Sequence, residues 1–176
     1  MEERKLKRLL MICSTVLLVG CAAGYDQHQI IGPETSLDRE AGVLISIPED
    51  GVYGGDVYSA SGRMTSNAIR AAFQKMGVST TVVEDCHGSE CLAREDIASY
   101  GYYVMPEILH WEERATEWSG KPDRIEIQIA VYDASSGEEL AKASYKGKSQ
   151  WATFGGDHPQ DLLPEPTNAY VQSLYE

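Results

Sequence analysis

The sequence predicts an α/β domain in which one mixed β-sheet carries helices mainly on one face. Two β-branched runs, 42–47 and 78–84, flank a segment at 61–76 whose apolar residues recur every fourth position. Further along, apolar and polar residues alternate strictly over 124–131, and a turn separates this strand from another at 139–150. The expected order is β-α-β-α-β-β-β-α, a sandwich with parallel crossovers followed by an antiparallel hairpin.

The first 21 residues have the layout of a secretory signal. Four basic residues precede an apolar run at 9–19, which is shorter than the roughly 20 residues that a membrane-spanning helix needs. The run ends in Leu-Val-Gly-Cys, which resembles a bacterial lipobox. This resemblance implies cleavage before Cys21 and attachment of lipid to Cys21, so that a membrane is the expected partner of the mature N-terminus.

Residues 22–41 show no periodicity and include two glycines and a proline. We expect a flexible tether here, followed by a single domain at 42–176. Ala22 is not the aspartate that commonly retains lipoproteins at the inner membrane. By resemblance to that sorting rule, the expected location is the outer membrane, facing the periplasm.

The charge of the chain disfavours nucleic-acid binding. The sequence has 15 basic and 27 acidic residues, and the leader takes four and two of them, which leaves a mature net charge of 11 minus 25, or −14. Nucleic-acid binding depends on Lys and Arg neutralising phosphates, so no nucleic-acid partner is expected. No phosphate-binding glycine loop or dinucleotide motif is present in the sequence, and we expect no cofactor.

In the first half of the domain, Pro48 stops the first strand and a glycine-rich loop at 49–56 leads to the first helix as a flexible connection. Ser61 is placed to cap that helix, and Gly77 is placed to end it before the second strand.

Two cysteines remain in the folded part, Cys86 and Cys91, in a short polar loop. In an oxidising compartment we expect them to form a disulfide, and a metal site with His87 as third ligand is the alternative. A short helix at 92–100 and a third strand at 102–110 follow.

A terminal helix is predicted at 166–174, after a proline-containing loop. Its expected apolar anchors are Leu162, Leu163, Val171 and Leu174. The hairpin at 129–140 is similar to a turn of several envelope lipoproteins, including activators of penicillin-binding proteins and the N-terminal domain of the Tol-system translocation protein. That resemblance implies a shared fold.

A closer resemblance covers nearly the whole mature chain. Its motifs are RMT at 63–65, PEILHWE at 106–112, ATEWSGKPDR at 115–124 and WATFGGDHPQDLLP at 151–164. They resemble a family of bacterial lipoproteins known as a domain of unknown function, DUF4823. The resemblance implies an envelope location and a fold, and it implies no particular activity.

Aromatic and charged residues gather in two loops, one after the third strand and one late in the chain. Both loops leave strand ends in the hairpin region, so we expect them to meet. Aromatic faces beside carboxylates suit sugars, peptides or a protein interface, whereas packing of the tryptophans against the domain is the structural alternative. The candidate binding surface is His110, Trp111, Glu112, Arg114, Trp118, Trp151, Phe154, Asp157 and His158.

No catalytic constellation stands out, and the sequence has no Gly-x-Ser-x-Gly elbow. Glu107 is expected on a buried strand, in an ion pair with Arg114 or Arg124. The leading hypothesis is a non-catalytic envelope lipoprotein whose periplasmic domain binds a protein or peptidoglycan. The rival is a metal-dependent hydrolase that uses His110, Glu112, Asp157 and His158.

Overall fold

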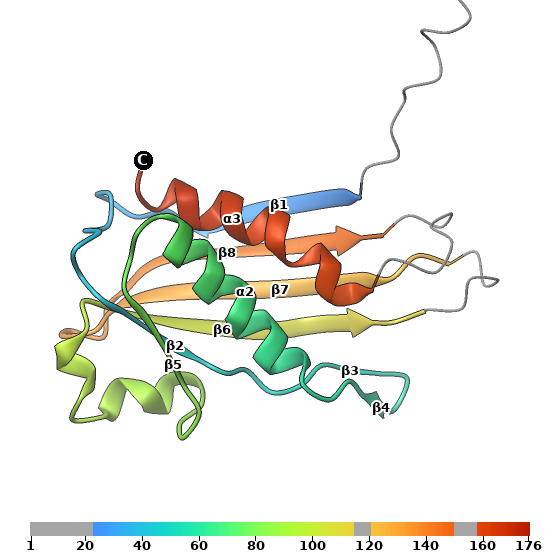
Figure 1. Cartoon of the computed structure of the whole chain (residues 1–176), viewed down its shortest axis with the longest axis horizontal. Coiled ribbons are helices and arrows are strands. Elements are labelled where there is room, and N and C mark those ends of the chain that lie inside the picture. The colour runs from blue at the N-terminus through green and yellow to red at the C-terminus, as the bar shows by residue number, and fades with distance from the viewer. Residues whose placement is uncertain (1–22, 115–120, 150–157) are drawn as a thin grey trace, which may run out of the picture.

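The computed structural model describes residues 23–114, 121–149 and 158–176. A six-stranded sheet has the order β1-β8-β7-β6-β2-β5, and β3 and β4 form a separate two-stranded ribbon (Figure 1). The strands are β1 Gly24–Ile31, β2 Val43–Ser46, β3 Val52–Tyr53, β4 Asp56–Val57, β5 Thr80–Val83, β6 Tyr102–Glu112, β7 Arg124–Asp133 and β8 Glu139–Lys148. The helices are α2 Ser61–Lys75 and α3 Pro164–Ser173, with short 3-10 helices η1 Gly88–Ala93, η2 Ile97–Ser99 and η3 Pro159–Leu162.

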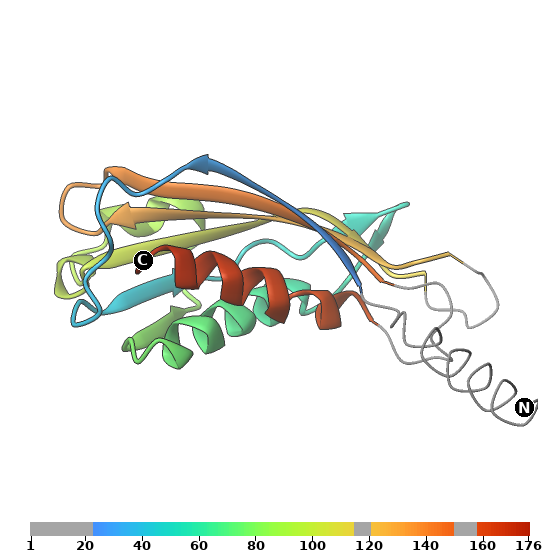
Figure 2. The same cartoon turned by 90° about the horizontal axis from the view of Figure 1, so that it is seen from above.

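The predicted fold class is confirmed. Helices α2 and α3 contact each other and cover one face of the sheet (Figure 2). Strand β2 is parallel to β5 and β6, whereas β6, β7 and β8 run antiparallel in sequence order. No helix of the described residues is both long enough and apolar enough to cross a bilayer.

The core lies between the helices and the sheet. The alternating apolar side chains of β7 form its surface on the side of the sheet. Ile125, Ile127 and Ile129 are buried on the helix-facing side, where Ile69 and Phe73 of α2 pack into the same cluster. The four predicted anchors of the terminal helix are all buried there as well: Leu162, Leu163, Val171 and Leu174.

The expected flexible tether is wrong over residues 24–31, because these residues form edge strand β1. Strand β1 pairs antiparallel with β8, from Gly24 opposite Lys148 to Gln29 opposite Ala143. An edge strand is held by main-chain hydrogen bonds, and most side chains of β1 are exposed, so the sequence needs no apolar periodicity there. Further on, Leu37 is buried and its N–H donates to the carbonyl of Leu174.

The N-terminus of α2 is capped from a distance, and the prediction that Ser61 caps it is wrong. The carboxylate of Asp50 accepts hydrogen bonds from the N–H groups of Ala60, at 3.0 Å, and Gly62, at 2.8 Å. The hydroxyl oxygen of Ser61 instead accepts from the N–H of Gly51 at 2.8 Å. Asp50 therefore satisfies helix N–H groups that the local sequence leaves open, and it fixes the loop before β3.

The segment at 49–56, expected as a flexible connection, instead forms β3 and the start of β4. Gly54 and Gly55 have positive φ of 63° and 96°. A two-residue hairpin turn that matches the right-handed twist of its strands requires such values at both positions. Gly-Gly supplies these values without steric cost.

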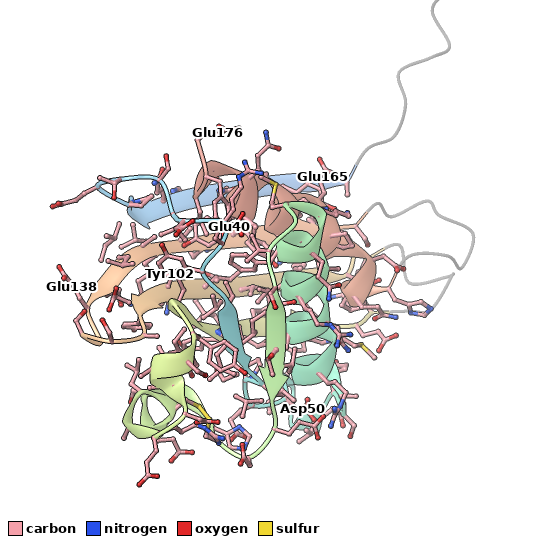
Figure 3. All side chains as sticks on the ribbon, turned by 60° about the vertical axis from the view of Figure 1, so that its left-hand side comes forward. Glu40, Asp50, Tyr102, Glu138, Glu165 and Glu176 are labelled. Carbon is pink, nitrogen blue, oxygen red and sulfur yellow. A yellow bond between two sulfur atoms is a disulfide. The ribbon has the colours of Figure 1, made fainter. Side chains whose placement is uncertain are left out.

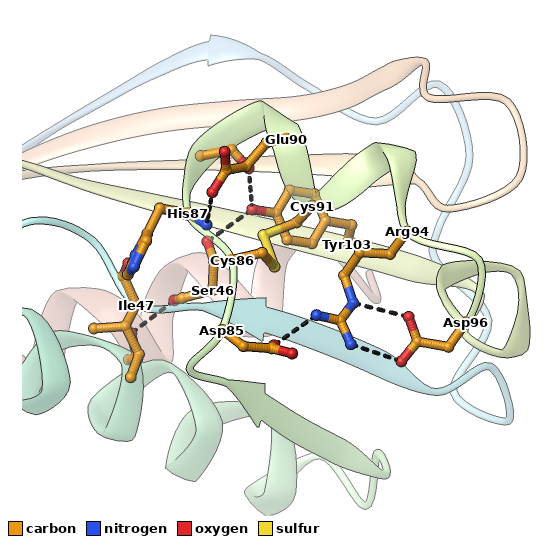
Figure 4. Close-up of a disulfide and its surroundings, with 12 residues drawn as sticks. Ser46, Ile47, Asp85, Cys86, His87, Glu90, Cys91, Arg94, Asp96 and Tyr103 are labelled. Atoms are coloured by element: carbon orange, nitrogen blue, oxygen red, sulfur yellow. Dashed lines mark hydrogen bonds and ion pairs between the residues drawn. A yellow bond between two sulfur atoms is a disulfide. The ribbon is translucent and has the colours of Figure 1, made fainter.

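A second, smaller core covers part of the opposite face of the sheet. Cys86 and Cys91 form a disulfide with a Cα–Cα distance of 5.4 Å, in agreement with the expected pairing (Figure 4). The disulfide packs with Leu44, Ile97 and Tyr103, and the region predicted as one helix at 92–100 is instead occupied by parts of η1 and η2.

Replacing both Cys86 and Cys91 with serine should lower the free energy of unfolding by about 2 kcal/mol, because the closed loop is short. Urea denaturation of the wild type and the double variant measures the difference. Adding a reductant to the wild type should reproduce the loss and leave the variant unchanged. Equal stability of the two proteins without reductant would contradict a structural role for this bond.

Candidate functional site

The predicted binding surface lies at the end of the sheet where β6 stops and β7 starts. Helices α2 and α3 begin at the same end, and so does β1 (Figures 1 and 2). Trp118, Trp151, Phe154 and Asp157 lie outside the described residues, as does Cys21. The five remaining members of the predicted surface are His110, Trp111, Glu112, Arg114 and His158.

Trp111 is a core residue, so its assignment to an exposed surface is wrong. Its side chain is 2% exposed and belongs to the main core cluster. The reason is an irregularity in the pairing of β6 with β7: Ile108 faces Ile127, but His110 already faces Glu126. The shift in register turns Trp111 toward the helices and leaves His110 and Glu112 on the opposite face.

Glu112 is buried, at 2% exposure, and yet it is ionised. Burial alone would raise the pKa of this carboxyl, but hydrogen bonds from Arg114, Tyr53 and His110 outweigh burial and lower the pKa below its ordinary value. Nε of Arg114 donates to one carboxylate oxygen, and Nε2 of His110 lies 3.4 Å from the other. The ring of Tyr53 meets that of His110 edge to face at 5.1 Å.

The main chain beside this cluster is tied to the neighbouring strands. The N–H of Arg114 donates to the carboxylate of Asp123 at 2.6 Å, and the N–H of Asp123 donates to the hydroxyl of Ser149 at 2.9 Å. Asp123 and Ser149 are themselves buried. These bonds connect the end of β6, the start of β7 and the end of β8. They hold the main chain beside the cluster in place.

The two predicted loops do meet, through residues at their edges. Nδ1 of His158 lies 3.0 Å from a carboxylate oxygen of Glu113, and both side chains are partly exposed. The residues of the hydrolase hypothesis therefore do not form one described cluster. Glu112 lies beside His110, whereas His158 pairs with Glu113, and Asp157 is outside the described residues. In the described ranges, no group of three or more His, Cys, Asp or Glu side chains is placed to hold a metal ion.

A groove that the sequence did not predict runs along the other side of β6. Its volume is about 670 Å³, and it is lined by the loop after β2, by η1 with the residue before it, and by the middle of β6. Its walls and floor are Ile47, Pro48, Glu49, Asp50, His87, Gly88, Ser89, Glu90, Met105, Pro106, Glu107 and Ile108. Figure 3 shows Asp50 at the start of α2. Figure 4 shows His87 and Glu90 in the loop that the Cys86–Cys91 disulfide closes.

Glu107 belongs to this groove, and the expectation that it is buried in an ion pair is wrong. Its side chain is exposed, and its carboxylate accepts a hydrogen bond from Nε2 of Gln128 at 3.1 Å. Glu107 lies on the face of the sheet opposite the helices, where, among the described residues, η1 and η2 provide the cover. Sequence reasoning missed the groove because its residues come from three separate segments without a common motif.

Comparisons with known proteins give a family and a fold. A family model described as a domain of unknown function, DUF4823, matches residues 35–174. No curated protein matches the chain.

Several solved structures have the same fold. The PelC dodecamer from Paraburkholderia phytofirmans aligns with a TM-score of 0.68 at 10% identity, over 86% of this chain and 98% of that chain. A DUF330 protein from Xanthomonas campestris, XCC0632, aligns with a TM-score of 0.50 at 13% identity, over 80% and 88% of the two chains. At these identities the likeness shows the fold alone.

Proposed function

The chain belongs to the DUF4823 family, and from this premise we propose that it is a non-catalytic lipoprotein of the cell envelope that binds a protein partner. In this proposal, lipid on Cys21 anchors the mature chain to the outer membrane, with the domain in the periplasm. The support is the lipobox-like end of the leader, together with the match of the family model to 35–174. The groove along β6 is the proposed binding site.

The open edge of β6 is the observation that carries this proposal. The ladder between β2 and β6 ends at Ile45 and Val104, and β3 packs beside the end of β6, so the free stretch of this edge lies around residues 105–108. Among the described strands, none pairs with β6 on this side beyond Val104. A partner in extended conformation can add its main chain at such an edge and place alternate side chains in the groove.

The chemistry of the groove favours a basic, partly apolar segment. Ile47, Met105 and Ile108 provide apolar surface. Glu49, Glu90 and Glu107 are exposed around it, and no ion pair within the described residues neutralises them. Charge complementarity selects partners more than it adds affinity, so we expect Lys or Arg to alternate with apolar residues in the bound segment.

Self-association is a second candidate function. The PelC structures, which share this fold, are dodecamers. In this chain, β1 leaves one edge of the sheet open, and Ile30 on it is 54% exposed. Exposed edges of this kind pair readily with other strands.

Photo-crosslinking distinguishes these candidates. A benzophenone amino acid at Met105 of the full chain, irradiated in native envelopes, should crosslink to another envelope protein. The charge reversals Glu49→Lys with Glu107→Lys should reduce the yield about tenfold, since each removes an attraction and adds a repulsion. The matched control, Glu138→Lys with Glu165→Lys, changes the net charge equally at exposed sites away from the groove and should leave the yield unchanged.

Three results would contradict the proposed groove function. Crosslinks only between copies of the chain would make the groove an assembly interface. Binding to purified sacculi that the charge reversals abolish, without any protein crosslink, would make peptidoglycan the ligand. Equal yields from both double variants would remove the acidic groove from the function.

A further inference from the structure

One end of the domain exposes a set of apolar side chains. Val52 and Val57 face each other across the β3–β4 ribbon and are 58% and 62% exposed. Leu109, at the irregular position of β6, is 46% exposed, and Tyr53 near the tip of the ribbon is 41% exposed. A ribbon of four strand residues cannot bury both valines by itself, so its surface is available to a partner.

The N-terminal attachment lies at the same end of the molecule. Strand β1 begins at Gly24, and Figures 1 and 2 place this point and the β3–β4 ribbon at one end of the sheet. Only Ala22 and Ala23 separate Gly24 from Cys21. Three residues span at most about 11 Å when fully extended. If lipid holds Cys21 in a bilayer, the pairing of β1 with β8 therefore keeps this end of the domain at the membrane surface.

Two cations lie beside the start of β1. Lys148 is opposite Gly24 on one side and opposite Arg124 on the other. Both cations are exposed, and they line a groove of about 500 Å³. The groove also contains Lys146 paired with Glu126, and the exposed Asp26, so Arg124 and Lys148 are the cations left for a ligand. Lysine and arginine at this position are suited to the phosphates of lipid headgroups, even though the chain as a whole is acidic.

We propose that this end of the domain is a membrane-contact face, in which Val52 and Val57 enter the boundary between headgroups and acyl chains while Arg124 and Lys148 meet lipid phosphates. The inference rests on the lipid anchor of the proposed function. Asp56, opposite Tyr53 at the tip of the ribbon, limits the depth, because a carboxylate must remain among the headgroups. Insertion of the valines to about 5–10 Å is the depth typical of interfacial elements.

The mature protein offers a clean labelling strategy. Cys13 leaves with the leader, Cys21 carries lipid, and Cys86 is bonded to Cys91, so a single introduced cysteine is the only free thiol. We would attach a nitroxide to Val57→Cys in the full acylated chain, reconstituted in phosphatidylethanolamine–phosphatidylglycerol vesicles. Glu138→Cys, in the exposed turn between β7 and β8 at the opposite end of the sheet, is the matched control (Figure 3).

The readout is the collision rate of the nitroxide with oxygen, which is enriched in lipid, relative to a water-soluble nickel chelate. The ratio should be severalfold higher at Val57 than at Glu138. It should fall toward the control value when Arg124→Glu and Lys148→Glu are added. Val57 is exposed, so the label does not disturb the core.

Flotation of the vesicles separates the possible failures. If the protein does not float, the lipid anchor of the proposed function is wrong and this inference fails with it. If it floats and the Val57 label collides with nickel as often as the control does, the membrane-contact face alone is wrong. A floating protein whose Val57 label is shielded from both reagents would have a protein contact there, most simply a second copy, and would also overturn the inference.

Discussion

Arg114→Ala should lower the free energy of unfolding by about 3 kcal/mol at pH 7, because it leaves the buried carboxylate of Glu112 without its cation. The expected loss is at the lower end of the range for broken buried pairs, since the Arg114 side chain is itself 24% exposed. Tyr53 and His110 still hydrogen-bond to Glu112 in the variant, so part of the carboxylate's environment is kept. Urea denaturation monitored by tryptophan fluorescence measures the change.

The loss should shrink as the pH falls. In the wild type, the lowered pKa of Glu112 means that its stabilising contribution is present above the unfolded value, about 4.3, and disappears as the pH falls through the folded value. In the variant, the guanidinium no longer offsets burial, so the pKa of Glu112 rises and protonation in acid relieves the penalty that is present at neutral pH.

The control for this prediction is a second substitution at the same site. Glu112→Gln in the Arg114→Ala background removes the unpaired charge and should recover part of the stability at pH 7. It should also flatten the pH dependence of the difference. A difference between wild type and Arg114→Ala that stays constant from pH 7 to pH 4.5 would show that the guanidinium acts only through packing.

The sequence predicts the elements of this fold well where periodicity is regular. The alternation over 124–131 comes from burial on one face, and the segment at 61–76 forms the expected helix. The buried face of that helix is centred on Thr65, Ile69 and Phe73, however, and Met64 of the predicted every-fourth stripe is exposed. Edge strand β1 escapes such reasoning, because main-chain bonds to β8 hold it while its side chains face solvent. Its detection would have required knowing that β8 has a free edge.

The candidate site could be predicted only in part, and the irregularity of β6 is the main reason. A single extra residue near Leu109 reverses which side chains face the helices, so Trp111 becomes core and Glu112 joins His110 on the other face. Nothing local in the sequence marks that residue. The aromatic and acidic residues of the segment therefore pointed to this end of the sheet. They also led to the prediction of an exposed Trp111, which is instead buried in the core.

The groove along β6 depends on contacts over long sequence distances. The carboxylate of Asp50 caps α2 at Ala60, ten residues later in the chain. The loop closed by the disulfide carries Glu90 and forms the opposite wall of the groove. The length difference between β2 and β6 opens the edge between these walls. Each feature is common by itself, and only the three-dimensional arrangement makes them one site.

Gly62→Ala should test whether the wall of that groove and the start of α2 are one structural unit. A Cβ at Gly62 would lie 2.2 Å from the carbonyl oxygen of Pro48 and 3.3 Å from the carboxylate of Asp50. The first clash is with main chain, so the loop must move and its cap on α2 weakens. We expect a loss of about 3 kcal/mol, from overpacking and from the damaged cap together. The benzophenone at Met105 should then also crosslink less, because Pro48 and Asp50 line its groove.

Ala60→Gly is the matched control, two residues away. Ala60 has φ of 70°, a conformation that strains every residue with a Cβ, and its N–H is held by Asp50. Removing the methyl group should stabilise the protein by about 1 kcal/mol and leave the crosslinking yield unchanged, because the relief of left-handed strain exceeds the entropic cost of glycine. Opposite signs for the two substitutions are the expected signature of a loop held by contact with the helix. If Gly62→Ala left the free energy of unfolding unchanged, the loop before β3 would have shifted without cost. A wall of the groove that shifts to make room for one methyl group could not define a binding site.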